Sequence, residues 1–129
     1  MKTRLFYEHE PDSLIMFKKD SLEIASWTES LEFINTELGY LLEIEDRMLN
    51  DSNLYSQLHA MRRENTLKLS ALYRYETAMR KTRECDTMAC DAYYLNNHEK
   101  HRHLYLEYLR NYRILKSKVL SKILFHAKR

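Results

Sequence analysis

The residues most able to do chemistry gather in one histidine-rich run, His98-Glu-Lys-His-Arg-His103. His98 and His101 are three residues apart, so a helix presents both on one face. Glu76 and His98 lie at equal distances on either side of a turn that we expect near residue 87. Helices that fold back at this turn would bring Glu76 to the level of His98. We therefore predict a buried polar layer made of Glu76, His98 and His101, beneath Trp27.

This polar layer allows three interpretations. The first is a hydrogen-bonded Glu–His pair that fixes the register of the helices. The second is a metal site with Glu76, His98 and His101 as ligands, but the Glu-x-x-His pairs of carboxylate-bridged metal bundles do not occur in this sequence. The third is an acid–base site, since a histidine beside a carboxylate can titrate near neutral pH. The sequence favours the first, and we expect no bound metal, no cofactor and no enzymatic activity.

The last third of the chain is basic and rich in tyrosine. From residue 100 to the end, 9 Lys and Arg residues stand against a single acid, Glu107. Cations that contact phosphates and aromatic rings that stack on bases are typical of nucleic-acid surfaces. However, Tyr105, Tyr108 and Tyr112 recur at the spacing of a helix core, and a buried ring cannot stack on a base. Nucleic-acid binding is therefore the second hypothesis, with these candidate contacts: Arg102, Arg110, Arg113, Lys116, Lys118 and Lys122.

Several other classes of function lack their sequence signals. A single glycine cannot form a glycine-rich phosphate loop, and neither a Gly-x-Ser-x-Gly nor a Cys-x-x-Cys motif occurs. Cys85 and Cys90 are five residues apart, about 140° around a helix, which favours free thiols and a reducing cytoplasm. The longest apolar runs, such as residues 14–17, fall far short of the roughly 20 residues that span a bilayer. We expect a cytoplasmic protein that does not enter a membrane.

The fold class follows from what the chain lacks. Gly39 and Pro11 are its only glycine and proline among 129 residues, so turns are few and the elements must be long. We predict a single all-α domain, an elongated antiparallel three-helix bundle of coiled-coil type. An irregular N-terminal arm over 1–20 precedes helices over 21–49, 53–84 and 88–126. Asn50-Asp-Ser-Asn53 predicts a turn, whereas residues 84–91 allow either a turn or one continuous helix.

Apolar residues at alternating spacings of three and four define the inward face of each predicted helix. Trp27 belongs to this face in the first helix and should be buried under the arm or the second helix. Gly39 indicates either a close approach of two helices or pressure from a ligand or a partner's backbone. The predicted inward positions of the first two helices are Ile24, Trp27, Leu31, Ile34, Leu38, Leu41, Glu45 and Met48, then Leu54, Leu58, Met61, Asn65, Leu69, Leu72, Glu76 and Met79.

Charge is distributed unevenly along the chain. Up to residue 50 there are 5 Lys and Arg against 11 Asp and Glu, and from residue 51 onward there are 16 against 8. The simplest explanation is an acidic first helix that lies beside a basic third helix, so that the two charges compensate.

Helix lengths predict an interaction surface at the C-terminal end. The third helix is longer than the second, so residues after 119 should overhang the bundle without a neighbouring helix of their own chain. An exposed apolar patch of this kind is typical of an interaction site. It would consist of Val119, Leu120, Ile123, Leu124 and Phe125.

These patterns lead to one main hypothesis of function. We expect a non-enzymatic helical module for protein–protein interaction, which forms a homodimer or binds another helical protein. An RNA-associated protein is the alternative, and a metal-binding helical bundle is the third.

Overall fold

The computed structural model describes the backbone of residues 2–83 and 88–127, and the side chains of residues 15–81 and 95–127. Four elements follow in order: helix α1 (Lys2–Ile44), the π-helical turn η1 (Glu45–Leu49), helix α2 (Ser52–Arg83) and helix α3 (Met88–Ala127). The chain is an all-α bundle of three helices, as predicted, and the described residues contain no strand.

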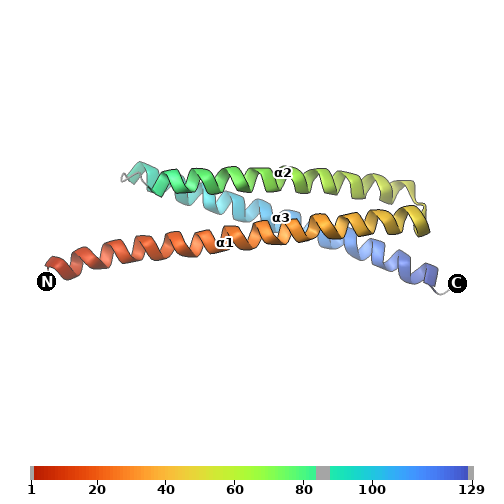
Figure 1. The fold of residues 1–129 in the computed structure, drawn as a ribbon, viewed down its shortest axis with the longest axis horizontal. Coiled ribbons are helices and arrows are strands. Elements are labelled where there is room, and N and C mark those ends of the chain that lie inside the picture. The colour runs from red at the N-terminus through yellow and green to blue at the C-terminus, as the bar shows by residue number, and fades with distance from the viewer. Residues whose placement is uncertain (1, 84–87, 128–129) are drawn as a thin grey trace.

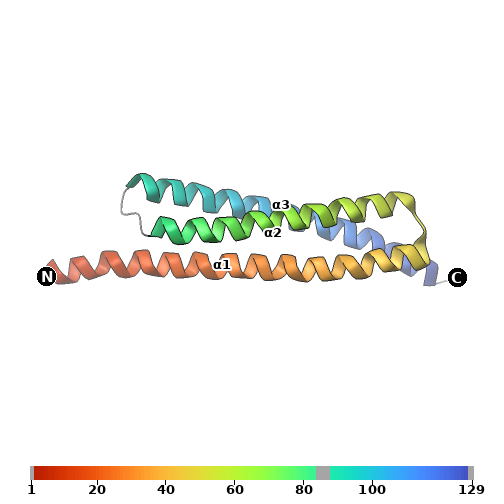
Figure 2. The ribbon, with the colours of Figure 1, turned by 45° about the horizontal axis from the view of Figure 1, so that its top comes forward.

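The helices lie side by side along one long axis. α1 runs the length of the molecule, α2 returns beside it after η1, and α3 makes the third pass (Figures 1 and 2). Because α2 and α3 lie next to each other, they are separate helices and not one continuous rod. α3 runs obliquely across the other two (Figure 1).

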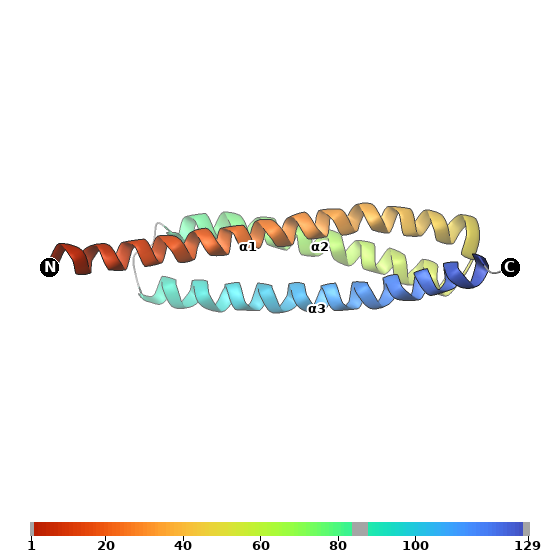
Figure 3. The same ribbon diagram turned by 90° about the horizontal axis from the view of Figure 1, so that it is seen from below.

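The N-terminal segment differs from the prediction. The expectation of an irregular arm over 1–20 was wrong, because α1 begins at Lys2 and continues without interruption through Pro11. The neighbours of this proline are of mixed helix propensity, with Glu8, Glu10 and Leu14 favourable, and a proline removes one backbone hydrogen bond from a long helix. The first turns of α1 extend past the ends of α2 and α3 and do not fold back onto them (Figures 1 and 3).

The core follows the predicted inward face of α1 up to Leu41, and Trp27 is only 5% exposed. Beyond Leu41 the inward positions are Glu45 and Leu49, whereas the predicted Met48 is exposed. The π-turn causes this shift, since the Asn50 N–H donates to Glu45 O, five residues back, over 2.8 Å. An extra residue per turn moves the next inward position forward by one.

The predicted turn at Asn50–Asn53 is built from its own side chains. Asn50 ends the helical run in the left-handed conformation, with φ 45°. Asp51 Oδ1 accepts hydrogen bonds from the backbone N–H groups of Asn53 (3.0 Å) and Leu54 (3.2 Å), which caps the start of α2. The buried Glu45 carboxylate accepts the N–H of Asp51 over 3.0 Å. This bond explains a carboxylate at an inward position.

The predicted C-terminal overhang is shorter than expected. Val119 is fully buried, Ile123 packs against the core, and Lys122 reaches Asp51 at the α1–α2 turn. The length count treated the helices as parallel rods, but the oblique path of α3 uses more residues to reach the same level. Of the five predicted surface residues, the exposed ones are Leu120, Leu124 and Phe125.

Candidate functional site

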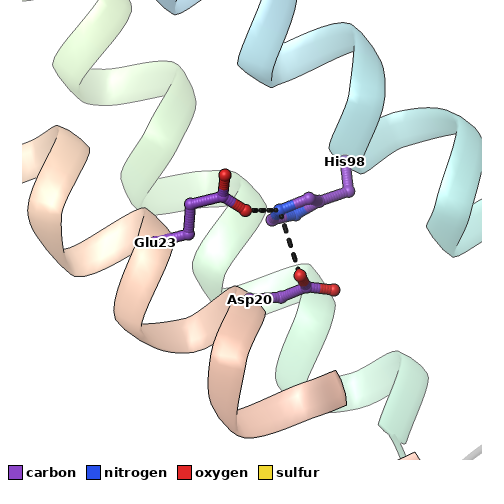
Figure 4. Close-up of side chains that lie close together, drawn as sticks. All are labelled: Asp20, Glu23 and His98. Atoms are coloured by element: carbon purple, nitrogen blue, oxygen red, sulfur yellow. Dashed lines mark hydrogen bonds and ion pairs between the residues drawn. The ribbon is translucent and has the colours of Figure 1, made fainter.

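The polar layer is centred on His98, which α3 places between the other two helices with 3% of its surface exposed. Its Nε2 lies 2.7 Å from Glu23 Oε1 and 3.4 Å from Asp20 Oδ1, two carboxylates one turn apart on α1 (Figure 4). Its Nδ1 lies 2.9 Å from the hydroxyl of Tyr75 on α2. All three helices therefore meet at this one imidazole.

Arg102, one turn after His98 on α3, keeps the carboxylate of Glu23 ionised. Its Nε and Nη2 donate to Glu23 Oε2 (2.9 Å) and Oε1 (2.7 Å), and these hydrogen bonds lower the pKa of Glu23 to about 2. An ionised carboxylate only accepts hydrogen bonds, so Nε2 of His98 carries the proton it donates to Glu23. Burial raises the pKa of Tyr75, so its hydroxyl keeps its proton where it lies 2.9 Å from Nδ1 of His98.

Aromatic rings close the layer. Trp27 stacks on His98 at 5.3 Å between ring centroids and on Tyr105 at 5.4 Å, so rings of α3 cover it. Tyr75 stacks on His101 at 4.2 Å. His101 is half-buried, and this burial lowers its pKa, with the nearby His98 adding to the effect.

The predicted role of Glu76 was wrong. Its carboxylate binds Arg80 on its own helix over 2.8 Å, and Tyr75 takes the inward position next to His98. From Leu72 to Met79 the steps are three and then four residues, whereas we predicted four and then three. Both spacings fit a heptad repeat, and only the contact with α3 decides which of them faces inward. His98 does lie in the layer, and His101 lies at its edge.

Asp20 and Glu23 were missed by the sequence analysis. Both precede Trp27 on α1, Glu23 by about one turn and Asp20 by about two, and their three-residue spacing places them on one face. We predicted that Trp27 and His98 lie at one level, and acids within two turns of that tryptophan were the signal that could have found them.

The cluster of Asp20, Glu23 and His98 has the donor types of a metal site, and its three ligand atoms lie within 4.8 Å of one another. The position of Arg102 argues against a cation there. Its guanidinium lies 2.7 Å from the same Glu23 oxygen that contacts His98, so a positive charge already occupies the approach. The geometry favours a network of hydrogen bonds and ion pairs that joins the three helices.

The layer offers little room for a substrate. A nearby depression, to which all three helices contribute, has a volume of about 130 Å³ and is lined mainly by apolar side chains, including Leu31, Leu72 and Tyr108. Pockets for small-molecule ligands usually measure about 300–1,000 Å³. His98 itself is covered by rings, so the described residues provide no open site for acid–base chemistry on a substrate.

Half of the predicted nucleic-acid contacts on α3 are engaged within the chain. Arg102 binds Glu23, Lys116 binds Glu37 over 2.9 Å, and Lys122 binds Asp51. Acids from α1 and the α1–α2 turn thus compensate part of the charge of the basic last helix. This is the explanation that we gave for the uneven charge distribution. The remaining three cations of that set are exposed: Arg110, Arg113 and Lys118.

The tyrosines of α3 are part of the core. Tyr108 is 1% exposed and donates to the Met61 carbonyl over 3.2 Å, while the buried Tyr112 donates to Glu37. Neither ring is available to stack on a base. The solvent face of α2 is the more basic surface, because five exposed cations lie there, of which one, Arg80, pairs with Glu76: Arg62, Arg63, Arg74, Arg80 and Lys81.

A row of apolar side chains on the outward face of α1 is the least expected feature. Ile15, Leu22, Phe33 and Tyr40 are 59%, 73%, 64% and 67% exposed. Their spacings of 7, 11 and 7 residues each correspond to whole helical turns within about 20°, so the four side chains share one face. We call these four residues the outer row. Core residues such as Leu31 lie about 160° around the helix from it.

Gly39 lies beside the outer row, on the same helix. A Cβ added there would meet no atom within 4 Å. The interpretation of close helix–helix approach within the chain was therefore wrong, and a ligand or a partner's backbone remains the other interpretation.

Comparison with known proteins adds no relative, because no family model, no curated protein and no solved structure matches this chain. Among the described residues, no helix combines the length and the apolar character needed to cross a membrane.

Proposed function

We propose that this protein is a non-enzymatic helical interaction module whose binding surface is the outer row of α1. The observation that carries this proposal is the exposure of four large apolar side chains, Ile15, Leu22, Phe33 and Tyr40, on a single helix face. Single exposed apolar residues are common, but an aligned set of them usually marks a site of interaction.

The geometry of the row suits a helical ligand. Apolar anchors at whole-turn spacings are the pattern by which one amphipathic helix packs along another. From Ile15 to Tyr40 the row extends about 38 Å along α1. No helix of the described chain covers this face, because α2 and α3 both lie on the opposite side of α1 (Figure 2).

The closed polar layer supports the non-enzymatic part of the proposal. His98, Glu23 and Arg102 satisfy one another inside the bundle, and Trp27 covers the imidazole. A group held in this way fixes which helices pair and at what level. This leaves the outer surface to carry the function.

The test is the size of the purified full-length protein, with any stoichiometric partner identified by mass spectrometry. We expect an assembly larger than the monomer that is lost when Leu22 and Phe33 are both replaced by Glu. The matched control replaces Leu67 of α2 and Ile114 of α3, which are 64% and 63% exposed, by Glu. This control should assemble like the wild type.

Two results would contradict the proposal. One is a monomer at high protein concentration with no stoichiometric partner. The other is an assembly that the α1 double variant leaves intact while circular dichroism shows normal helicity for all proteins.

Nucleic-acid binding remains a second candidate function, because one observation favours it on α2 instead of the predicted surface of α3. The solvent face of α2 carries five exposed cations, of which Arg80 pairs with Glu76, and the rings of Tyr55 and Tyr73 are about half exposed on the same helix. Such a surface should bind an RNA oligonucleotide with an affinity that falls steeply with salt. Replacing Arg63 and Arg74 by Ala should weaken this binding more than the same change at Arg110 and Arg113. Equal effects, or no retention on RNA at low salt, would argue against it.

A further inference from the structure

We propose that the helix that covers the outer row is α1 of a second copy of this chain, packed antiparallel about a two-fold axis between residues 27 and 28. This inference rests on the proposed function, since it names the occupant of the same surface. A two-fold dimer uses the same patch on both copies, so the patch must be complementary to itself. The outer row meets this condition.

The spacing of the row is the first argument. Its intervals of 7, 11 and 7 residues read the same in both directions. An antiparallel partner centred between residues 27 and 28 therefore places Ile15 at the level of the second copy's Tyr40, and Leu22 at the level of its Phe33. Each anchor meets an anchor, and each aromatic ring meets an aliphatic side chain. An unrelated partner helix would not require this symmetry.

The direction of the row is the second argument. A step of 7 residues drifts about 20° backward around a straight helix, and a step of 11 residues drifts about 20° forward. Because the two steps alternate, the row stays parallel to the axis of α1. Two such helices can then lie along each other over the whole length of the row, instead of crossing at one point.

Charge is the third argument, and it selects the antiparallel orientation. Lys18 and Lys19 flank the Ile15 end of the row, whereas the exposed Glu43 flanks the Tyr40 end. α1 carries no Lys or Arg from residue 20 to its end at Ile44. An antiparallel pair brings the lysines of one copy to the acidic half of the other, while a parallel pair would align like charges along both halves.

The centre of the row fits the same arrangement. Ser26 and Glu29 lie on this face between Leu22 and Phe33, and both are polar. The proposed axis places Ser26 of each copy at the level of Glu29 of the other, where the hydroxyl can donate to the carboxylate. Two polar residues at the middle thus pair across the axis and specify the register.

The test is site-specific cross-linking between two cysteine variants of the full chain. Lys18 and Thr36 are exposed, lie five turns apart on the same side of the row, and leave its four anchors intact. One variant carries Lys18→Cys and the other Thr36→Cys, both with Cys85 and Cys90 replaced by Ser. A short bis-maleimide should link a mixture of the two variants and give a peptide joining positions 18 and 36. Either variant alone should remain uncross-linked, because its own two cysteines would be about 27 Å apart.

Links within either variant alone would overturn the antiparallel arrangement and indicate a parallel pair. A homodimer that gives no link in any mixture would place the dimer contact elsewhere. Assembly with a different protein that depends on Leu22 and Phe33 would leave the proposed function standing and overturn only this inference. As a control, adding Leu22→Glu and Phe33→Glu to both variants should abolish the link between positions 18 and 36.

Discussion

Two neighbouring residues of α1 reverse the usual rule of burial. Leu22 is apolar and 73% exposed, whereas Glu23 is acidic and turned into the bundle toward His98 and Arg102. The inner face of α1 at this level is a charged network in which the groups satisfy one another. The outer face is apolar and has no partner within the described chain.

The contrast separates two tasks. A polar group that is buried with its partners makes the fold specific, because a wrong helix pairing would leave a charge without its counter-charge. An exposed apolar side chain contributes little to the stability of its own chain. Its surface can still be buried against a second chain, and that burial favours binding. On this view substitutions on the inner face change stability, while substitutions on the outer row change assembly.

The largest expected difference in stability is between two aromatic truncations on α1, one on its inner face and one on its outer face. Trp27→Ala removes a ring that stacks on His98 and Tyr105, and it should lower the free energy of unfolding by about 3–5 kcal/mol. Phe33→Ala, six residues later on the outer row, should change the stability of the monomer by about 0.5 kcal/mol or less. Urea denaturation at low protein concentration measures both. Equal losses would break the distinction between the two faces.

A smaller effect is expected at Glu23. Glu23→Gln replaces an ionised acceptor of three hydrogen bonds and should lower the free energy of unfolding by about 1–3 kcal/mol at pH 7. The pKa of Glu23 lies below its ordinary value, so its stabilising contribution is present above pH 4.5 and is lost as the pH falls toward about 2. The difference between variant and wild type should shrink over that range. Glu29→Gln is the control, and a difference independent of pH would contradict the ion pair with Arg102.

The change Gly39→Ala should act in the opposite direction. Gly39 is helical and a Cβ would meet open space, so alanine should raise the free energy of unfolding by roughly 0.5–1 kcal/mol. Thermal unfolding of the two proteins at low concentration tests this. If Gly39→Ala instead weakens assembly, the contact between copies extends from the outer row to the side of α1 that carries Gly39.

The smallest effect is expected at His101. Burial lowers its pKa, so the unfolded chain binds a proton at this residue more readily than the folded chain does. Stability should therefore decline as the pH falls below about 6.5. His101→Phe keeps a ring against Tyr75 and should decline less over the same range, as followed by chemical denaturation at several pH values. Identical profiles would show that His101 has no part in this pH dependence.

Much of the fold was readable from local patterns. Alternating steps of three and four residues define an inward face on each helix, and Ile24, Leu31 and Leu38 lie there as predicted. The turn at 50–53 was readable because Asn and Asp carry their own capping groups. The start of the first helix was not, since Pro11 and the mixed residues around it predicted an irregular segment.

The residues that make up the polar layer depended on the other helices. A heptad allows Tyr75 or Glu76 to face inward, and the steric and hydrogen-bonding demands of His98 on α3 select Tyr75. The partners of His98 on α1 depend on the level at which two helices distant in sequence meet. A π-turn and an oblique crossing set that level, and neither has a clear signal in the sequence.

The amino-acid sequence thus determined that this protein consists of long helices, which face of each helix is apolar, and where the first turn lies. Local hydrogen bonding and side-chain periodicity are sufficient for these features. Only the tertiary structure decided that Glu23 is inside and Leu22 outside. The inward direction is defined by the positions of α2 and α3. Because those helices pack on the other side of α1, the side chains of Ile15, Leu22, Phe33 and Tyr40 form an exposed surface.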